Sequence, residues 1–209
     1  MVQKSGSVSE GTAKRGRPRA YDPATALARA TAAFWDAGFA ATSLDDLAAA
    51  TGMNRPSLYA AFGDKRELYL KTLQHYRDEY RALARQTLAD DPTLRVFLKR
   101  FYDAALDIYL AGEGGARGCY SIGTAATEAT VDPNVRAFLA DSTRNTDAFL
   151  KSRIDKARER GEIAQDADTT ALAYLATATM HTVAIRSRAG LARKELDAIV
   201  DAAIDVICG

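Results

Sequence analysis

The chain has 209 residues, with 28 Lys and Arg against 27 Asp and Glu and a formal net charge of +1, so its bulk charge argues neither for nor against a nucleic-acid partner. This length can bury a substantial core in one large or two small domains. The only two cysteines, Cys119 and Cys208, lie far apart without metal-ligand spacing, which argues against a disulfide framework or a metal site and favours a reducing compartment. We find no apolar signal core and no stretch long enough for a membrane span, and we expect a soluble cytoplasmic protein.

The first 20 residues are rich in Ser, Gly, Lys and Arg and lack periodicity, so we expect a basic arm over 1–20 that is disordered off DNA. From Pro23 onward the pattern is helical. The first helix is predicted over about 23–38, with Asp22 as its N-cap, Pro23 at its first position and Gly38 at its end.

The most informative stretch is residues 42–67, which predict two short helices joined by a glycine turn. Ser43 can cap the first helix, which runs into Gly52, and glycine suits a left-handed helix exit. The second helix begins near Asn54 with Pro56 in its first turn, where a missing N–H costs little. A turn of a few residues containing glycine is how a DNA-binding helix-turn-helix is built.

Six further helices are expected, which gives an all-α chain of about nine helices. Asp64 and Glu67 form a capping-box variant at the start of a helix that runs to about residue 88. Proline, glycine and aspartate breaks then separate helices over about 92–111, 119–130 and 133–160, with a glycine-rich loop at 112–118. The next helix begins after Asp166 or Asp168 and extends to about Arg188, and the last one carries an apolar stripe from Leu196 to Ile207.

The run T-S-L-D-D-L-A-x-x-x-G-x-N-x-P-S-L-Y-x-x-F-x-D-K-x-x-L, from Thr42 to Leu68, resembles the DNA-binding domain of TetR/AcrR-family transcriptional regulators. The resemblance begins at Gly16-Arg17-Pro18-Arg19, continues through residues 33–39 and ends near Leu70. It implies a three-helix helix-turn-helix domain over 21–68 and a helical effector-binding and dimerisation domain over 69–209. It also implies no cofactor and no metal.

Two features of the sequence are predicted to contact DNA. The basic arm suits a narrow minor groove, although it can also be a chance cluster. On the second helix of the helix-turn-helix, Arg55 can contact guanine through two hydrogen bonds. Ser43 and Tyr59 have alternative roles in capping and core packing. Ala60 and Ala61 depart from the family pattern, in which a polar or aromatic residue often precedes the Phe. The predicted contacts are Arg15, Arg17, Arg19, Thr42, Ser43, Asn54, Arg55, Pro56, Ser57, Tyr59 and Lys65.

Aromatic and polar residues of the second domain can line an effector pocket, or they can simply form its core. Cys119 follows the glycine-rich loop and opens a helix, which would suit a thiol sensor as well as a structural thiol. The predicted pocket residues are Phe97, Phe101, Tyr102, Tyr109, Cys119, Tyr120, Phe138, Tyr174 and His181.

The last two helices form the predicted homodimer interface, since two-fold symmetry matches a palindromic operator. Their residues can instead close the core of one subunit. The predicted interface residues are Leu172, Leu175, Thr179, Val183, Leu196, Ile199, Val200, Ala203, Ile204 and Ile207.

We therefore expect a ligand-responsive repressor that a small-molecule effector releases from a palindromic operator. One alternative is a regulator that senses oxidants or electrophiles through Cys119. A helical enzyme is a remote alternative, because the sequence has two scattered histidines, no nucleophile–base arrangement and no phosphate-binding loop.

Overall fold

The computed structural model describes residues 22–86, 90–112 and 115–209, so the predicted arm residues Arg15, Arg17 and Arg19 lie outside the described residues. Within these ranges the fold is all-α, as the sequence predicts. Its helices are α1 (Pro23–Ala41), α2 (Leu44–Thr51), α3 (Arg55–Phe62), α4 (Lys65–Gln86), α5 (Leu94–Leu110), α6 (Ala126–Glu128), α7 (Pro133–Glu159), α8 (Thr169–Arg188) and α9 (Arg193–Cys208). None of the described helices is long and apolar enough to cross a membrane.

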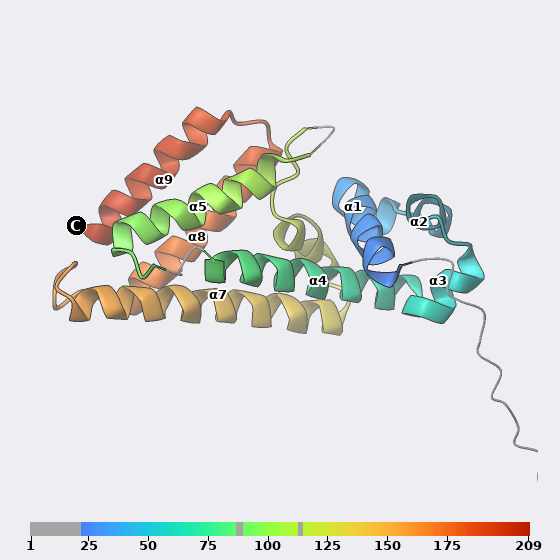
Figure 1. Cartoon of the computed structure of the whole chain (residues 1–209), viewed down its shortest axis with the longest axis horizontal. Helices are drawn as coiled ribbons and strands as arrows, with labels where there is room; N and C mark the ends of the chain where they lie inside the picture. The colour runs from blue at the N-terminus through green and yellow to red at the C-terminus, as the bar shows by residue number, and fades with distance from the viewer. Residues whose placement is uncertain (1–21, 87–89, 113–114) are drawn as a thin grey trace, which may run out of the picture.

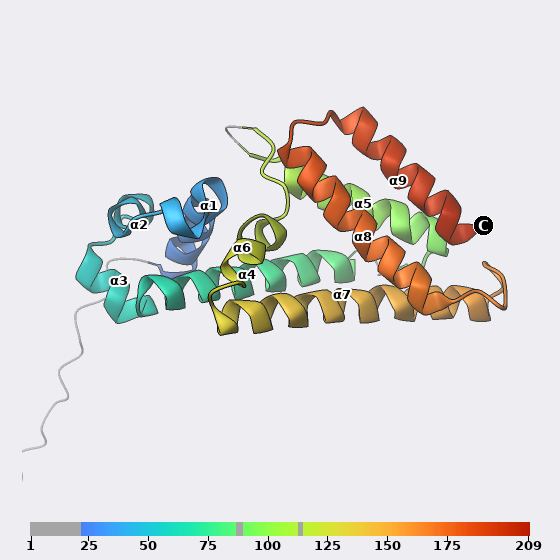
Figure 2. The same cartoon turned by 180° about the vertical axis from the view of Figure 1, so that it is seen from behind.

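The helices form two groups that α4 connects (Figure 1). Helices α1–α3 lie at one end of the molecule, and α5, α7, α8 and α9 lie at the other, with α7 running alongside α4 (Figure 2). Helix α4 packs against α1 at its N-terminal end and against α7 further along. One continuous helix therefore contacts both groups.

Short polar side chains begin most of the helices, as the sequence predicts. The carboxylate of Asp22 accepts hydrogen bonds from the first backbone N–H groups of α1. Ser43 Oγ accepts from Asp46 N at 3.1 Å while Asp46 Oδ2 accepts from Ser43 N at 2.8 Å, which completes a capping box on α2. Asp64 and Glu67 make the corresponding reciprocal bonds at the start of α4, each at 2.8 Å.

Two local departures from the expected helices follow from the backbone. Gly38 leaves helical geometry with φ 80°, but helical turns resume and carry α1 to Ala41. The helix expected over about 119–130 is instead a π-helical turn, Ser121–Ala125, that leads into the short α6. Thr124 Oγ1 donates to the Tyr120 carbonyl at 2.9 Å within this wider turn. Such turns are frequent at functional sites.

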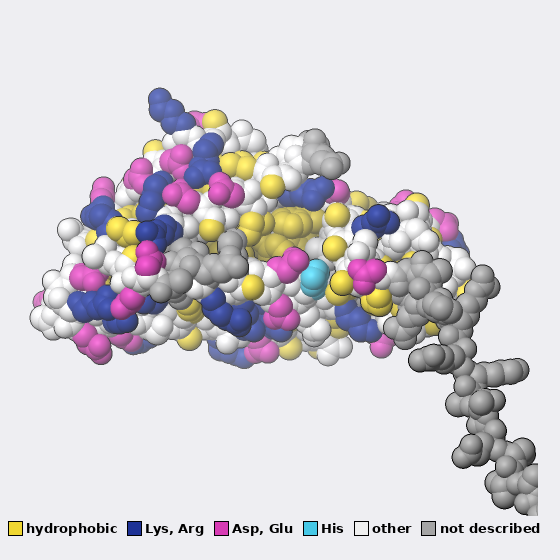
Figure 3. Space-filling view, in the orientation of Figure 1, with side chains coloured by type: hydrophobic (Ala, Val, Ile, Leu, Met, Phe, Trp, Pro, Cys, Tyr) yellow, Lys and Arg dark blue, Asp and Glu magenta, His cyan; other side chains and the backbone are white. Residues whose placement is uncertain are grey.

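Both groups of helices contribute to one buried apolar core. In the first, Phe34 of α1 packs edge-on against Tyr69 of α4 with ring centroids 5.1 Å apart, and Leu47 of α2 is fully buried beside them. In the second, α5 supplies fully buried residues such as Leu98 and Leu106, which face α8 and α9. Acidic and basic side chains are mixed over the outer surface (Figure 3).

Candidate DNA-binding surface and ligand cavity

Helices α2 and α3 are joined by a turn that glycine makes possible. Gly52 has φ 69°, the left-handed conformation in which glycine carries no steric penalty, and the chain enters α3 two residues later. Leu58 and Phe62 are buried on the inner side of α3, whereas Tyr59 is 47 % exposed on its outer side. The arrangement presents one face of α3 to a partner.

Three of the predicted DNA contacts, Thr42, Ser43 and Asn54, cap helices. Asn54 Oδ1 accepts a hydrogen bond from Ser57 N at 2.9 Å, so this amide begins α3. Thr42 is buried, and its Oγ1 donates to the Gly38 carbonyl at 2.6 Å, so it secures the end of α1 and is not available at the surface. This placement corrects the prediction for Thr42. Ser43 remains exposed while it caps α2.

An ion pair between α2 and α3 holds the predicted guanine-reading side chain. Arg55 Nε donates to Asp45 Oδ1 at 2.9 Å, and Arg55 Nη2 donates to Asp45 Oδ2 at 2.5 Å. The hydrogen bond that Arg55 donates to Asp45, together with the negative charge of Asp45, raises the pKa of Arg55. Both residues stay largely exposed, so Arg55 is oriented without being buried. The sequence analysis missed this pair, although both residues lie in the first turns of adjacent helices.

Lys65 lies at the first position of α4 against the ring of Phe39, with Nζ 4.4 Å from the ring centroid. Partial burial lowers the pKa of Lys65. The side chain is half-buried at the end of the molecule that α3 occupies. Its position leaves it beside the helix-turn-helix, where the sequence places a phosphate contact.

A cavity of about 320 Å³ lies between α4, α5, α7 and α8. Of the predicted pocket residues, Phe101, Tyr109, Cys119 and His181 line it. Four others are buried elsewhere: Phe97, Tyr102, Tyr120 and Phe138. Tyr174 is 58 % exposed on α8 and borders a separate hollow, so the structure does not place it in the cavity.

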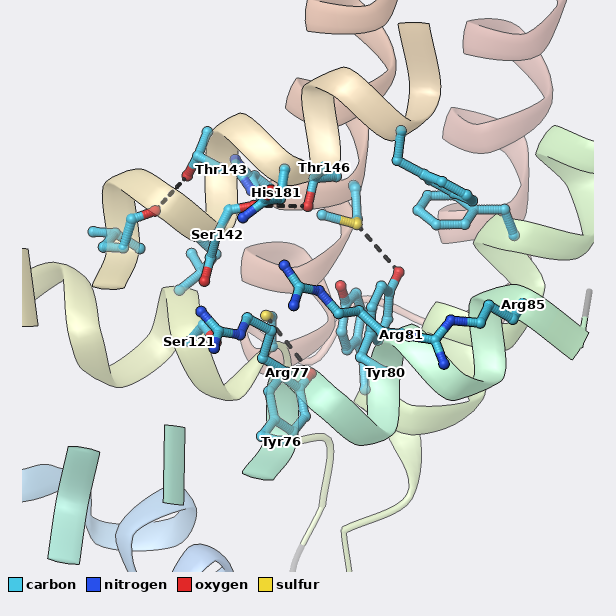
Figure 4. A pocket seen from close by; sticks show the side chains of 18 residues that line it. Tyr76, Arg77, Tyr80, Arg81, Arg85, Ser121, Ser142, Thr143, Thr146 and His181 are labelled. Carbon is cyan, nitrogen blue, oxygen red and sulfur yellow. Dashed lines mark hydrogen bonds between the residues drawn. The ribbon is translucent and has the colours of Figure 1, made fainter. Parts of the chain in front are cut away.

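The sequence analysis missed most of the lining. Helix α4 contributes Tyr76, Arg77, Tyr80, Arg81 and Arg85, and α7 contributes a polar row that includes Ser142 and Thr146 (Figure 4). The spacing of 76, 80 and 77, 81, 85 by four residues would have placed these side chains on one face of α4.

Burial favours the neutral forms of two tyrosines and the histidine in the cavity. It raises the pKa of Tyr76 and of Tyr109 well above their ordinary value, and it lowers the pKa of His181 despite the charge of Asp147. Tyr76 Oη donates to Cys119 Sγ at 3.7 Å, and Tyr80 Oη donates to Met180 Sδ at 3.3 Å. The cavity therefore has an aromatic wall with its hydroxyl groups turned towards sulfur.

Both groups of helices match known protein families. Residues 26–72 match the family described as bacterial regulatory proteins, tetR family, and residues 95–203 match the tetracyclin repressor-like C-terminal domain. The chain belongs to the TetR family. It is a DNA-binding transcriptional regulator and not an enzyme.

Several TetR-type relatives cover most of the chain. It is 29% identical over 183 residues to the HTH-type transcriptional repressor ComR of Escherichia coli K12, a match that covers 87% of each chain. It is 31% identical over 160 residues to the regulator YezE of Bacillus subtilis 168, covering 76% of this chain and 81% of YezE. Among solved structures, a cysteine mutant of the TetR-family regulator CifR, complexed with 26bp operator DNA, has a TM-score of 0.78 at 29% identity, covering 91% of this chain and 98% of CifR.

In this TetR-family chain, much of the predicted dimer surface is buried within the subunit. Thr179, Val183, Leu196, Val200, Ile204 and Ile207 are each at most 7% exposed and face the interior. The regular apolar stripe of α9 is therefore its inner face, which packs on α5 and α8. The outer faces carry other apolar residues: Ala171, Tyr174, Leu175, Ala178 and Ile185 on α8, and Ala198, Ala202 and Val206 on α9. Leu172, Ile199 and Ala203 are half-buried between the two faces.

Polar contacts join α4 of this TetR-family chain to the wall of the cavity and to α3. Tyr69 Oη donates to Thr124 Oγ1 at 2.7 Å in the π-helical turn, and Arg66 Nη1 donates to Asp132 Oδ2 at 2.6 Å at the start of α7. Lys71 Nζ donates to the Phe62 carbonyl at the end of α3. A shift of α4 would therefore act on both ends of the molecule.

Proposed function

We propose that this regulator is a homodimeric repressor that binds a palindromic operator through α3 and is released by a small-molecule effector bound in the cavity. The outward face of α3 is the observation that carries the proposal. Arg55 and Tyr59 are exposed on it while Leu58 and Phe62 anchor its inner side. A helix with this division of residues suits the major groove, where Arg recognises guanine. Two relatives support this function: ComR, a repressor, and a CifR mutant, whose structure is a complex with operator DNA.

A homodimer is proposed because the outer faces of α8 and α9 are apolar. Tyr174 and Ile185 are 58% and 59% exposed on α8, and Val206 is 66% exposed on α9. The same patch on two copies forms a two-fold interface, and two-fold symmetry presents two α3 helices to two operator half-sites. Helices α8 and α9 lie side by side at the end away from α3, which leaves both reading helices accessible (Figure 2).

Release by an effector is proposed to act through α4. This helix carries Tyr76 and Tyr80 into the cavity, while its N-terminal turns pack on α1 and hold the end of α3 through Lys71. The two positions of α4 correspond to two spacings of the α3 helices in the dimer. A ligand shifts the equilibrium between these two states only by as much as its affinity for them differs. The proposed switch is thus a shift between two arrangements of the dimer.

A thiol-based signal is the second candidate, and Cys119 favours it by lining the same cavity. The thiol is 9% exposed and accepts a hydrogen bond from Tyr76 on α4. Oxidation of this sulfur would add polar atoms beside α4 and disturb the helix that an effector would move.

The operator is identified by selecting fragments of the source genome that the full-length protein retains, then measuring affinity by fluorescence anisotropy at several salt concentrations. We expect the selected fragments to share a palindrome and to bind far more tightly than unrelated DNA. A variant without residues 1–19 should bind more weakly, and its salt slope should fall by about 0.9 for each phosphate that the arm no longer neutralises. Equal affinity for selected and unrelated DNA at every salt concentration would contradict an operator-binding function.

A further inference from the structure

The cavity carries charge of one sign. Among its described lining residues are three arginines, Arg77, Arg81 and Arg85, and no aspartate or glutamate. The arginines are four residues apart on α4, so they lie along one face of the helix. Like charges at this spacing repel one another, which favours a ligand or counter-ion of opposite charge.

Arg77 and Arg81 are poorly compensated by the protein itself. The ion-pair partner that they share is Asp78, which is 3.9 Å from each and 67% exposed. The guanidinium of Arg77 lies over the Phe138 ring, 5.0 Å from its centroid, and the buried Nε has no hydrogen-bond partner among the described residues. A buried donor of this kind costs free energy until an acceptor reaches it.

The facing wall on α7 offers further polar groups. Ser142 Oγ is also buried without a hydrogen-bond partner. Figure 4 shows Arg77 and Arg81 extending from α4 towards α7, with Ser142 close to the head of Arg77, whereas Arg85 points away along α4. Unsatisfied donors on two helices thus meet at one end of the cavity.

Another part of the cavity lining is apolar. Phe101 and Tyr109 from α5, Phe149 from α7 and Met180 from α8 line it. The volume of about 320 Å³ lies at the lower end of the range for small-molecule sites. A bound molecule would therefore be small, with an apolar, flat body and an acidic group at one end.

We propose that the effector is a small organic acid whose acidic group binds Arg77, Arg81 and Ser142 and whose apolar body lies among Phe101, Tyr109 and Phe149. This inference rests on the proposed function, because it specifies the ligand of the same cavity. Guanidinium groups bind carboxylates through paired, charge-assisted hydrogen bonds, which distinguishes an acid from a neutral molecule of the same shape.

The test compares acids with their primary amides, which have nearly the same shape without the charge. Benzoate, phenylacetate and 1-naphthoate, each paired with its amide, are titrated into the full-length protein. Binding is measured by calorimetry and by the fluorescence of Trp35, the single tryptophan. This residue can report on the cavity because its ring centroid lies 5.0 Å from that of Tyr76, which lines the cavity. We expect at least one acid to bind about tenfold or more tightly than its amide.

Variants of the two arginines test whether Arg77 and Arg81 cause the preference for an acid over its amide. In Arg77→Gln, Arg81→Gln and the double variant, the ratio of acid affinity to amide affinity should fall close to one. General damage to the cavity would weaken binding of both molecules and would leave this ratio unchanged. Arg100→Gln is the matched control, since Arg100 is exposed on α5 and pairs with Asp90 at 2.8 Å outside the cavity. The control should keep the wild-type ratio.

Two results would overturn the inference: no acid of the three binds more tightly than its amide, or the preference survives in the double variant. Operator affinity is measured on the same samples to separate the two proposals. If wild-type protein binds its operator but shows no preference for the acids, the proposed ligand class is wrong and the proposed function still stands. Protein that prefers the acid but binds no selected DNA fragment contradicts the proposed function and leaves the ligand class standing.

Discussion

Lys71 of α4 donates a hydrogen bond of 2.7 Å to the carbonyl oxygen of Phe62, the last residue of α3. The final carbonyl groups of a helix have no partner within it, and a cation there also interacts favourably with the helix dipole. The side chain of Phe62 is buried against the same group of helices. Helix α4 therefore fixes the end of the proposed reading helix through both a polar and an apolar contact.

Replacing Lys71 with methionine should loosen α3 and weaken operator binding. The variant keeps the apolar part of the side chain and loses the hydrogen bond, which contributes about 1 kcal/mol to the free energy of unfolding. Lys151→Met is the control, because Lys151 makes a half-buried pair with Asp155 four residues along α7, and helix pairs at this spacing are worth about 0.3–0.5 kcal/mol. Urea unfolding and operator anisotropy measure both effects. Equal operator affinity of the two variants would show that Lys71 does not hold α3 for reading.

Asp132 combines two roles that two substitutions separate. Its Oδ1 accepts from Asn134 N at 2.8 Å to begin α7, and its Oδ2 accepts from Arg66 on α4. Asp132→Asn keeps a good capping residue and removes the ion pair, whereas Asp132→Ala removes both. We expect the alanine variant to be less stable than the asparagine variant by about 1 kcal/mol in urea unfolding. Equal stabilities would mean that the cap contributes nothing.

The pH dependence of unfolding provides an independent check on Asp132. The hydrogen bond from Arg66 lowers the pKa of Asp132 below its unfolded value. The stabilisation is therefore fully present above the unfolded pKa of about 4 and is lost as pH falls through the folded pKa. Between about pH 5 and pH 3, Asp132→Asn should lose less stability than wild type. A parallel loss in both proteins would contradict the assignment.

An aspartate on the outer face of α9 should separate the proposed dimer. Val206→Asp places a charge in the apolar face, and a charge buried there without a partner is strongly unfavourable. The matched control is Val131→Asp, since Val131 is 72% exposed just before α7 and lies on neither α8 nor α9. Size-exclusion chromatography with light scattering should give monomers for the first variant and dimers for the second. If the two variants have the same mass in solution, the outer face of α9 is not the dimer interface.

Cys119→Ser separates the effector signal from a thiol signal. If an acid occupies the cavity, the serine variant should still respond to that acid, because serine is close to cysteine in size. Hydrogen peroxide should then leave both wild type and the variant bound to operator DNA. Release of wild type alone would establish Cys119 as the sensor and replace the effector mechanism.

Local signals in the sequence predicted the helical fold and the helix-turn-helix well, while the cavity depended on tertiary packing. The glycine at 52, the caps at Ser43 and Asn54 and the Asp64–Glu67 pair define α2, α3 and the start of α4 through contacts within four residues. The resemblance over Thr42–Leu68 was correct as to family.

The cavity could not be predicted in the same way. Aromatic content alone does not distinguish Phe101, which lines it, from Phe97 one turn earlier, which packs beside Phe101 with ring centroids 5.9 Å apart. The sequence was equally ambiguous about which face of α9 is buried within the subunit. Its strong apolar stripe, with Val200 and Ile204, is the inner face, and the weaker stripe of alanines and Val206 is the outer one.

The central claim is that α3 reads DNA through Arg55, and the most direct test measures operator affinity and base preference together. Arg55→Ala is compared with wild type and with Arg144→Ala, an arginine that is 72% exposed on α7. The measurement is fluorescence anisotropy on the selected operator and on operators changed at each symmetric base pair. We predict that Arg55→Ala loses about 1–3 kcal/mol of binding free energy, roughly fivefold to a hundredfold in affinity, and no longer discriminates at one base pair of each half-site. An Arg55→Ala protein with wild-type affinity and wild-type base preference would contradict the account.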